Sequence, residues 1–319
     1  MKKVLITGCE GFIGSNLWDY LENKGFNVFG IDIICSESKN KFKVDINSLD
    51  DLDKIVLKIS PDYIIHLAAR TDISNDPSWK YFSNTLGVNN LITVSNKVKN
   101  LQRVIFTSTQ LVNKLGDKFI NYENYTANTT YGESKVIGEL LVRSKIIDKE
   151  WIIVRPSTVW GPKMGKHYIN FFKYISKGLY FNITIKKTFK SFSYIGNLIY
   201  QMEKLLLADS NLVNKKTFYL SDYKPLEVHN WTKNISINLN NKNIYSIPIQ
   251  LSLLIAWVFN FLIFLKLIKK APVSVYNIKN ISTNVVNNND LLEITGPLPY
   301  NLNNAIIETT NWFKKLNLL

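Results

Sequence analysis

The sequence predicts a doubly wound α/β domain with a parallel sheet, followed by a smaller domain. In residues 1–155, short and continuously apolar runs alternate with longer helical patterns. Strands of this kind, separated by helices, indicate a parallel sheet that is covered on both faces. A glycine-rich loop separates the first apolar run from the first helix, and the alternation stops after Pro156.

The elements of the first half follow from these patterns. The predicted strands are Lys3–Thr7, Asn27–Asp32, Tyr63–Leu67, Arg103–Thr107 and Trp151–Arg155. The predicted helices are Gly11–Lys24, Leu49–Ile59, Tyr81–Lys97 and Tyr131–Lys145. Gly25 ends the first helix in the C′ position, and Pro156 ends the last strand. We expect residues 1–155 to form a domain that binds a cofactor. We expect residues 156–319 to form mainly a substrate-binding domain, with parts of the chain crossing back to the first domain.

Composition excludes several classes of protein. The 319 residues are 46% hydrophobic, which rules out intrinsic disorder. The net charge of +14 accompanies a bias toward Lys, Asn and Ile, and the basic residues are scattered, so no nucleic-acid partner is expected. Two cysteines and a first glycine at Gly8, too early for a signal peptide, predict a cytoplasmic protein. Three widely separated histidines suggest no metal site.

One apolar segment, Ile247–Ile268, is long enough to span a bilayer. It is interrupted by Pro248, Gln250, Asn260 and Lys266. Three interpretations stay open: a helix or dimer surface of the substrate domain, a peripheral membrane contact through residues 247–270, and a membrane span. The lysines at its end, Lys266, Lys269 and Lys270, would suit a helix lying on anionic lipid.

The first chemical signal is the loop Gly8-Cys9-Glu10-Gly11-Phe12-Ile13-Gly14, between a strand and a helix. Glycines allow a tight turn and let the backbone approach a pyrophosphate, which then lies at the helix N-terminus. Asp32 ends the second strand, where a carboxylate accepts hydrogen bonds from the adenosine ribose and repels a 2′-phosphate. The first half is therefore predicted to be a Rossmann-type domain that binds NAD rather than NADP.

The second signal is Tyr131-Gly132-Glu133-Ser134-Lys135. Residues four apart share a helix face, so the Tyr131 phenol and the Lys135 ammonium point into one site. A nearby cation favours the phenolate, which makes Tyr131 a candidate acid/base. Ser108 and Thr109 directly follow a strand, at the edge of the sheet where ligands bind.

These signals together resemble the extended short-chain dehydrogenase/reductase family, and within it the NAD-dependent epimerase/dehydratase group acting on nucleotide sugars. The likeness extends over the whole chain. Its matching segments are Thr7–Gly14, Asp45-Ile46, His66–Ala69, Asn84 with Gly87 and Asn90, Arg155–Pro162 and Lys190–Ile195. In the family, such segments bind the dinucleotide and its adenine, form strand ends in the catalytic region, or contact the diphosphate of the substrate.

The resemblance implies roles residue by residue. Tyr131 would be the catalytic acid/base, Lys135 would hold the nicotinamide ribose, and Thr109 would bind the sugar hydroxyl being oxidised. The implied cofactor contacts are Gly8, Gly11, Phe12, Ile13, Gly14, Asp32, Asp45, Ile46, Leu67, Ala68, Ala69, Asn84, Thr107, Tyr131, Lys135 and Pro156. The implied substrate contacts are Thr109, Thr158 and Lys190. Family members often form homodimers through the helix that carries the catalytic tyrosine.

Departures from the family pattern narrow the reaction. Sugar 4,6-dehydratases have Asp-Glu where this chain has Gln110-Leu111, so elimination of water is disfavoured. Val112-Asn113-Lys114 replaces a usual Val-Tyr-Gly, and Lys190 replaces a diphosphate-binding Arg, which keeps the charge but loses the bidentate fork.

The leading hypothesis is a nucleotide-sugar epimerase, inverting C4 of a UDP-hexose or UDP-N-acetylhexosamine in surface polysaccharide biosynthesis. A nucleotide-4-keto-sugar reductase that makes a deoxysugar is the alternative. A hydroxysteroid-type dehydrogenase is a third interpretation, suggested by the apolar segment. A non-catalytic NAD-sensing protein is disfavoured because Thr109, Tyr131 and Lys135 are all present.

Overall fold

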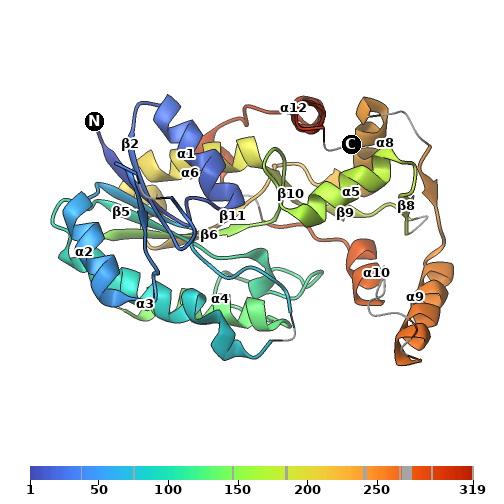
Figure 1. The fold of residues 1–319 in the computed structure, drawn as a ribbon, viewed down its shortest axis with the longest axis horizontal. Coiled ribbons are helices and arrows are strands. Elements are labelled where there is room, and N and C mark those ends of the chain that lie inside the picture. Colours follow the sequence, from blue (N-terminus) through green and yellow to red (C-terminus); the bar gives the residue numbers. More distant parts are fainter. Residues whose placement is uncertain are drawn as a thin grey trace.

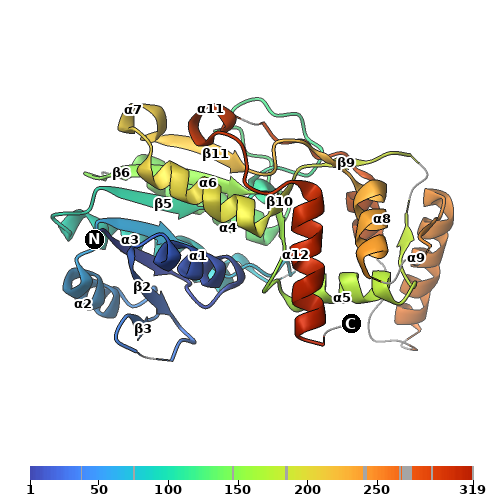
Figure 2. The ribbon, with the colours of Figure 1, turned by 90° about the horizontal axis from the view of Figure 1, so that it is seen from above.

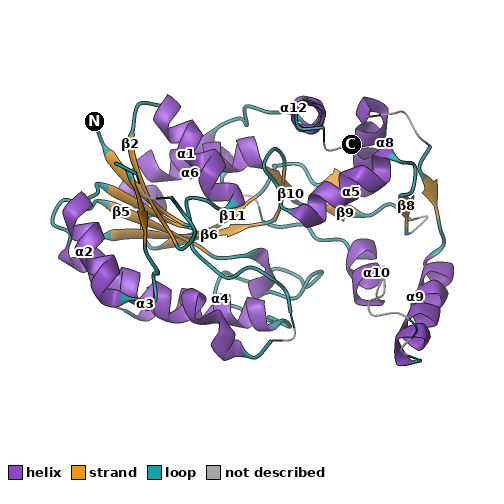
Figure 3. Ribbon diagram, viewed as in Figure 1, coloured by secondary structure: helices purple, strands orange, loops and turns teal. Residues whose placement is uncertain are grey.

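A single parallel sheet of seven strands organises the first half of the chain (Figures 1 and 3). The computed structural model describes residues 1–319 apart from 37, 75, 146, 184–185, 240–242, 266, 268–274, 289 and 318–319. The strand order is β11-β6-β5-β4-β1-β2-β3. The strands are β1 (Lys3–Thr7), β2 (Asn27–Asp32), β3 (Lys41–Lys43), β4 (Tyr63–His66), β5 (Arg103–Thr107), β6 (Glu150–Pro156) and β11 (Lys216–Leu220).

Helices cover both faces of this sheet, as Figure 1 shows. On one face lie α1 (Phe12–Asn23) and α6 (Ile195–Leu207). On the other lie α2 (Leu49–Ile59), α3 (Phe82–Lys97) and α4 (Thr130–Ser144). Each layer has its own buried apolar cluster, one around Leu17 and Leu198 and one around Leu52, Leu91 and Val142. The predicted doubly wound fold is therefore confirmed.

The strand order reverses between β1 and β4, and this is where the fold positions a ligand. In open parallel sheets, ligands bind outside the carboxyl ends of the strands at such a reversal. Thr7 and His66 end these two strands side by side, and the Thr7 hydroxyl lies 2.7 Å from His66 Nδ1. The same hydroxyl accepts hydrogen bonds from the backbone N–H groups of Leu67 and Ala68, so it fixes the chain where it leaves β4.

Two strands of the sheet were not predicted. β3 has only three residues, and β11 comes from the second half of the chain, pairing in parallel with β6. The strand β6 also runs through Pro156, one residue beyond the predicted end. Proline is tolerated there because it is the last residue of the strand, and the ladder continues through the Ser157 N–H, which donates to the Leu220 carbonyl.

A second lobe is built from short strands and helices (Figure 2). Its strands are β7 (Thr158–Trp160), β8 (Phe181–Asn182), β9 (Phe189–Lys190), β10 (Phe192–Tyr194), β12 (Leu226–Glu227) and β13 (Tyr245–Ser246). Its helices are α5 (Lys166–Ser176), α8 (Val228–Leu239), α9 (Ile249–Phe264), α10 (Val275–Ser282) and α12 (Leu302–Lys315), while the short α7 (Ser210–Val213) and α11 (Leu292–Thr295) lie beside the sheet domain. Trp160, Phe172, Trp231 and Phe313 pack ring against ring in the centre of this lobe.

Most of the apolar segment Ile247–Ile268 forms helix α9, which begins at Ile249 and ends at Phe264. Lys266, Lys269 and Lys270, which the sequence associates with a lipid surface, lie outside the described residues. Among the helices that the structure describes, none combines the length and the apolar character needed to cross a membrane.

Candidate active site

A cavity of about 800 Å³ opens at the carboxyl ends of the sheet strands. Most of the predicted site residues lie in its wall. They are Gly8, Gly11, Phe12, Ile13, Gly14, Asp32, Asp45, Ile46, Leu67, Ala68, Ala69, Thr107, Thr109, Tyr131, Lys135 and Pro156. The fold therefore brings residues as far apart as Gly8 and Pro156, which are 148 positions apart in the chain, into one connected site.

The glycine loop has the backbone geometry that a bound pyrophosphate requires. Gly8 has φ +75°, and a Cβ there would lie 2.7 Å from the Ala68 nitrogen. A Cβ on Gly14 would lie 2.1 Å from the carbonyl oxygen of Gly8. Gly11 caps α1 in an extended conformation, no side chain caps the helix, and its first turn has no acidic residue. The positive end of α1 thus faces the cavity, where an anion is favoured.

The adenosine end of the cavity is formed after β2 and β3. One Asp32 carboxylate oxygen accepts the Glu10 N–H at 3.0 Å, and the other accepts the Ile34 N–H at 3.3 Å. These bonds fix the carboxylate and leave it lone pairs for ribose hydroxyls. Ile46 packs against Gly87, where a Cβ would lie 2.5 Å from its side chain. The loop and these residues together fit NAD.

Tyr131 and Lys135 lie one turn apart on α4, and both are almost fully buried. Burial raises the pKa of Tyr131 to about 12, while a hydrogen bond with Thr109 acts in the opposite direction. Burial lowers the pKa of Lys135 to about 8. Lys135 is not among the groups that shift the pKa of Tyr131, so the expected lowering of this pKa by Lys135 is not confirmed in the protein alone.

A buried ion pair supports this part of α4, and the sequence analysis missed it. Glu139, one turn beyond Lys135, accepts hydrogen bonds from Arg155 Nε at 2.8 Å and Nη2 at 2.7 Å. It also accepts the Ser108 hydroxyl at 2.5 Å and the Tyr125 hydroxyl at 3.0 Å. The Glu139 charge raises the pKa of Lys135 against the effect of burial. The signal in the sequence that could have predicted this pair is an acidic residue, Glu139, one helical turn after Lys135.

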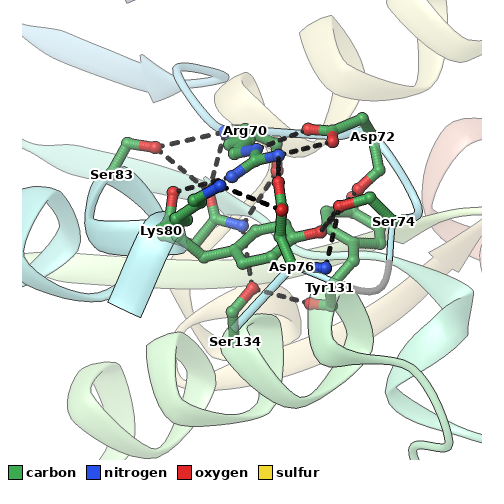
Figure 4. Close-up of polar contacts among 10 residues, drawn as sticks. Arg70, Asp72, Ser74, Asp76, Lys80, Ser83, Tyr131 and Ser134 are labelled. Atoms are coloured by element: carbon green, nitrogen blue, oxygen red, sulfur yellow. Dashed lines mark hydrogen bonds and ion pairs between the residues drawn. The ribbon is translucent and has the colours of Figure 1, made fainter. Parts of the chain in front are cut away.

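A second unpredicted group lies beside Tyr131 on the loop after β4 (Figure 4). Arg70 binds Asp72 bidentately, with Nε and Nη2 at 2.6 and 2.7 Å from its two oxygens, and also pairs with Asp76. Its guanidinium lies 4.7 Å from the centroid of the Tyr81 ring. That ring is fully buried and lies 6.4 Å from the Tyr131 ring. The Tyr81 ring therefore packs beside the candidate catalytic phenol, and Arg70 of the loop lies over that ring.

Asn84 does not reach the cavity, contrary to the cofactor contact expected of it. Its side chain is fully buried, and its side-chain amide forms hydrogen bonds with other residues of the protein. Its Oδ1 accepts the Arg70 N–H at 2.9 Å, and its Nδ2 donates to the Arg70 carbonyl and to Ser134 Oγ. Asn84 thus joins the loop after β4 to helix α4.

The two substrate contacts expected in the second lobe also lie outside the cavity wall. Thr158 Oγ1 accepts a hydrogen bond from Gln110 Nε2 at 3.2 Å, which places Thr158 near the segment that follows β5. Lys190 Nζ donates to the Asn280 carbonyl of α10 at 2.6 Å. Burial lowers the pKa of Lys190 to about 8. In this structure the Lys190 ammonium is thus bound to α10.

Comparison with known proteins agrees with this site. Residues 4–203 match the model of the NAD dependent epimerase/dehydratase family. The chain is 28% identical over 225 residues to GDP-6-deoxy-D-talose 4-dehydrogenase of Aggregatibacter actinomycetemcomitans, covering 66% of this chain and 73% of that protein. It is 27% identical over 270 residues to UDP-glucose 4-epimerase of Vibrio cholerae, covering 78% of this chain and 79% of that protein.

Solved structures share the fold across the chain. The Bordetella bronchiseptica enzyme WbmH in complex with NAD+ has a TM-score of 0.75 at 17% identity, with 99% of each chain covered. UDP-glucose 4-epimerase of Thermotoga maritima with UDP-glucose has a TM-score of 0.73 at 17% identity, again with 99% of each chain covered. The family match covers more than half of the chain and includes the glycine loop, Tyr131 and Lys135. The chain therefore belongs to the NAD-dependent epimerase/dehydratase family, and its cofactor is NAD.

Proposed function

We propose that the protein is a nucleotide-sugar epimerase that inverts C4 of a UDP-hexose or UDP-N-acetylhexosamine. The observation that carries this proposal is the position of Thr109, Tyr131 and Lys135 in the wall of the cavity that the glycine loop also lines. A sugar hydroxyl bound there would contact a hydroxyl and a phenol at once. The UDP-glucose 4-epimerases among the relatives support the choice of reaction.

The residues of the chain would divide the work as follows. Bound NAD supplies the acceptor and donor of hydride, so the reaction needs no net oxidant or reductant. Tyr131 would take the proton of the C4 hydroxyl and later return it to the inverted oxygen. Thr109 would orient that oxygen, and Lys135 would bind the nicotinamide ribose. Gln110 beside them carries no charge, which suits a reaction in which no water is eliminated.

The test is a panel of UDP-, GDP- and dTDP-sugars incubated with the purified protein and no added reductant. Sugar proton signals are followed by NMR, and we expect a second stereoisomer to appear with one UDP-sugar. The variant Tyr131→Phe should lose turnover by a factor of about 10²–10⁴ while still binding NAD. If Tyr131→Phe remains fully active, the assignment of the acid/base is wrong.

A nucleotide-4-keto-sugar reductase is the second candidate, and the similarity to GDP-6-deoxy-D-talose 4-dehydrogenase favours it. Tyr131 would then donate a proton to the keto oxygen, the reduced cofactor would supply the hydride, and Thr109 and Lys135 would keep the same roles. This reaction consumes one reduced cofactor in each cycle. No change across the panel, followed by turnover when a nucleotide 4-keto sugar and NADH are supplied, would replace the epimerase proposal with this one.

A further inference from the structure

Helix α9 exposes an unusual amount of apolar surface. Along Ile247–Leu265 the sequence has no charged residue. Ser252 and Ala256 of α9 are buried, and α9 packs against α10. Small side chains one turn apart allow this close contact, and they leave the large side chains on the rest of the helix facing outward.

The outward side is a continuous stripe. Leu254 is 62% exposed, Trp257 73%, Phe261 56% and Phe264 79%. Their spacing of three and four residues puts them on one face of the helix, and Leu251, Val258 and Leu265 widen the stripe. Both ribbon views place α9 at the end of the molecule opposite the N-terminus (Figures 1 and 2). A contiguous apolar surface of this kind marks an interaction site.

The chain around α9 is basic without any acidic residue. Between Glu227 and Asp290 the sequence has six lysines and no aspartate or glutamate. Between Glu150 and Glu203, which includes the neighbouring α5 and β8, it has seven lysines and again no acidic residue. The net charge of the protein is thus concentrated in the half of the chain that carries α9, because acidic residues are scarce there while lysines are spread along the whole chain.

Charge and apolar surface together identify the partner. Two copies of this chain meeting at α9 would bring together the lysine-containing stretches on both sides of α9, which have no acidic residue, and these would repel each other. An anionic lipid surface supplies the opposite charge at its headgroups and an apolar layer directly beneath them. A helix of 16 residues is about 24 Å long, shorter than the roughly 30 Å hydrocarbon core. We propose that α9 lies in the interface of an anionic phospholipid bilayer, with Leu254, Trp257, Phe261 and Phe264 in the acyl layer.

The test is co-sedimentation of the full chain with vesicles of phosphatidylglycerol and phosphatidylcholine, compared with vesicles of phosphatidylcholine alone. We expect binding to the anionic vesicles that is at least tenfold tighter and that weakens as salt is added. The triple variant Leu254→Ser, Trp257→Ser, Phe261→Ser should lose at least tenfold in affinity.

The matched control is Leu207→Ser, Leu212→Ser, Ile307→Ser. These three side chains are 49%, 43% and 45% exposed and lie on α6, α7 and α12, away from α9. This variant should bind like the unchanged protein. A third variant, Lys266→Ser, Lys269→Ser, Lys270→Ser, keeps every apolar side chain of α9. We expect it to bind anionic vesicles more weakly, and this loss cannot result from unfolding of α9 by serine substitutions within the helix.

Three outcomes would overturn the proposal. In the first, the unchanged protein stays in the supernatant with anionic vesicles. In the second, the α9 variant and its control lose binding equally, which would mean that any exposed apolar residue serves. In the third, light scattering shows an oligomer that only the α9 variant dissociates, which would mean that a second copy covers the stripe.

Discussion

Replacing Glu139 by glutamine tests the buried ion pair that supports helix α4. The Glu139 side chain is 2% exposed, and that of Arg155 is fully buried. Glutamine has almost the same shape as glutamate, so little packing is lost, but the guanidinium of Arg155 loses the charge that neutralises it. Removing one partner of a buried pair costs about 3–5 kcal/mol, because the remaining charge stays desolvated.

The structure sets the cost at the lower end of this range. Arg155 keeps two other acceptors, the Tyr122 carbonyl at 2.6 Å and the Tyr219 hydroxyl at 3.3 Å. We therefore expect Glu139→Gln to lower the free energy of unfolding by about 3 kcal/mol. The same change removes the charge that raises the pKa of Lys135, so that pKa should fall below its value of about 8.

Urea denaturation followed by circular dichroism measures the first effect. The control is Asp19→Asn, which breaks an ion pair with Lys163 of similar length (2.6 Å) whose side chains are 60% and 40% exposed. Its cost should be at most about 0.5 kcal/mol. The double variant Glu139→Met, Arg155→Met should recover most of the stability, because neither member of the pair is then left buried without its partner. Equal losses in Glu139→Gln and Asp19→Asn would refute the reasoning.

Three further outcomes are expected. Gly14→Ala should destabilise the protein by about 2 kcal/mol and abolish NAD binding, because its Cβ meets the Gly8 carbonyl, whereas Gly165→Ala, with nothing within 4 Å, should cost about 0.5 kcal/mol; equal thermal shifts would contradict this. Asp32→Asn should weaken NAD binding about tenfold in calorimetry and narrow the preference over NADP, and an unchanged ratio would argue against its ribose contact. Burial raises the pKa of Asp222 from 3.8 to about 6, so the folded state binds more protons between these values, and stability falls as pH rises through them. Relative to Asp222→Asn, the unchanged protein should lose about 3 kcal/mol between pH 4 and 7 in urea titrations, and parallel curves would contradict the shift.

Nearly all residues that the sequence analysis expected at the cofactor lie together in the cavity wall, whereas Thr158 and Lys190, expected at the substrate, do not. Gly8, Gly14 and Asp32 act through backbone geometry and strand ends, which a local pattern records directly. Glu139 and Arg155 are 16 residues apart on a helix and a strand, and only the packed sheet shows that they meet. Lys190 was placed by a motif, but its bond to α10 depends on how a distant segment folds back.

The same limit applies to the sheet. β11 is a short apolar run in a stretch where alternation has already failed, so nothing local indicates that it joins the sheet. Its position depends on β6, in which residues Ile152–Pro156 pair with it. The apolar segment is a contrasting case, since its sequence predicted an unusual surface but allowed three interpretations of it.

The position of β11 has a consequence for how the chain is made. Synthesis delivers β1 to β6 first, yet the edge strand that pairs with β6 is complete only at Leu220. Until then a nascent chain would carry Trp151, Ile152, Ile153 and Val154 on an open edge, a template for pairing with other chains. Until α6 is made, Arg103 would also lack the carbonyls of Leu205 and Leu206, to which it donates at 2.8 Å in the finished fold. Ribosome-bound chains that stop before β11 should therefore recruit chaperones, whereas chains extended past α6 and β11 should be released from them.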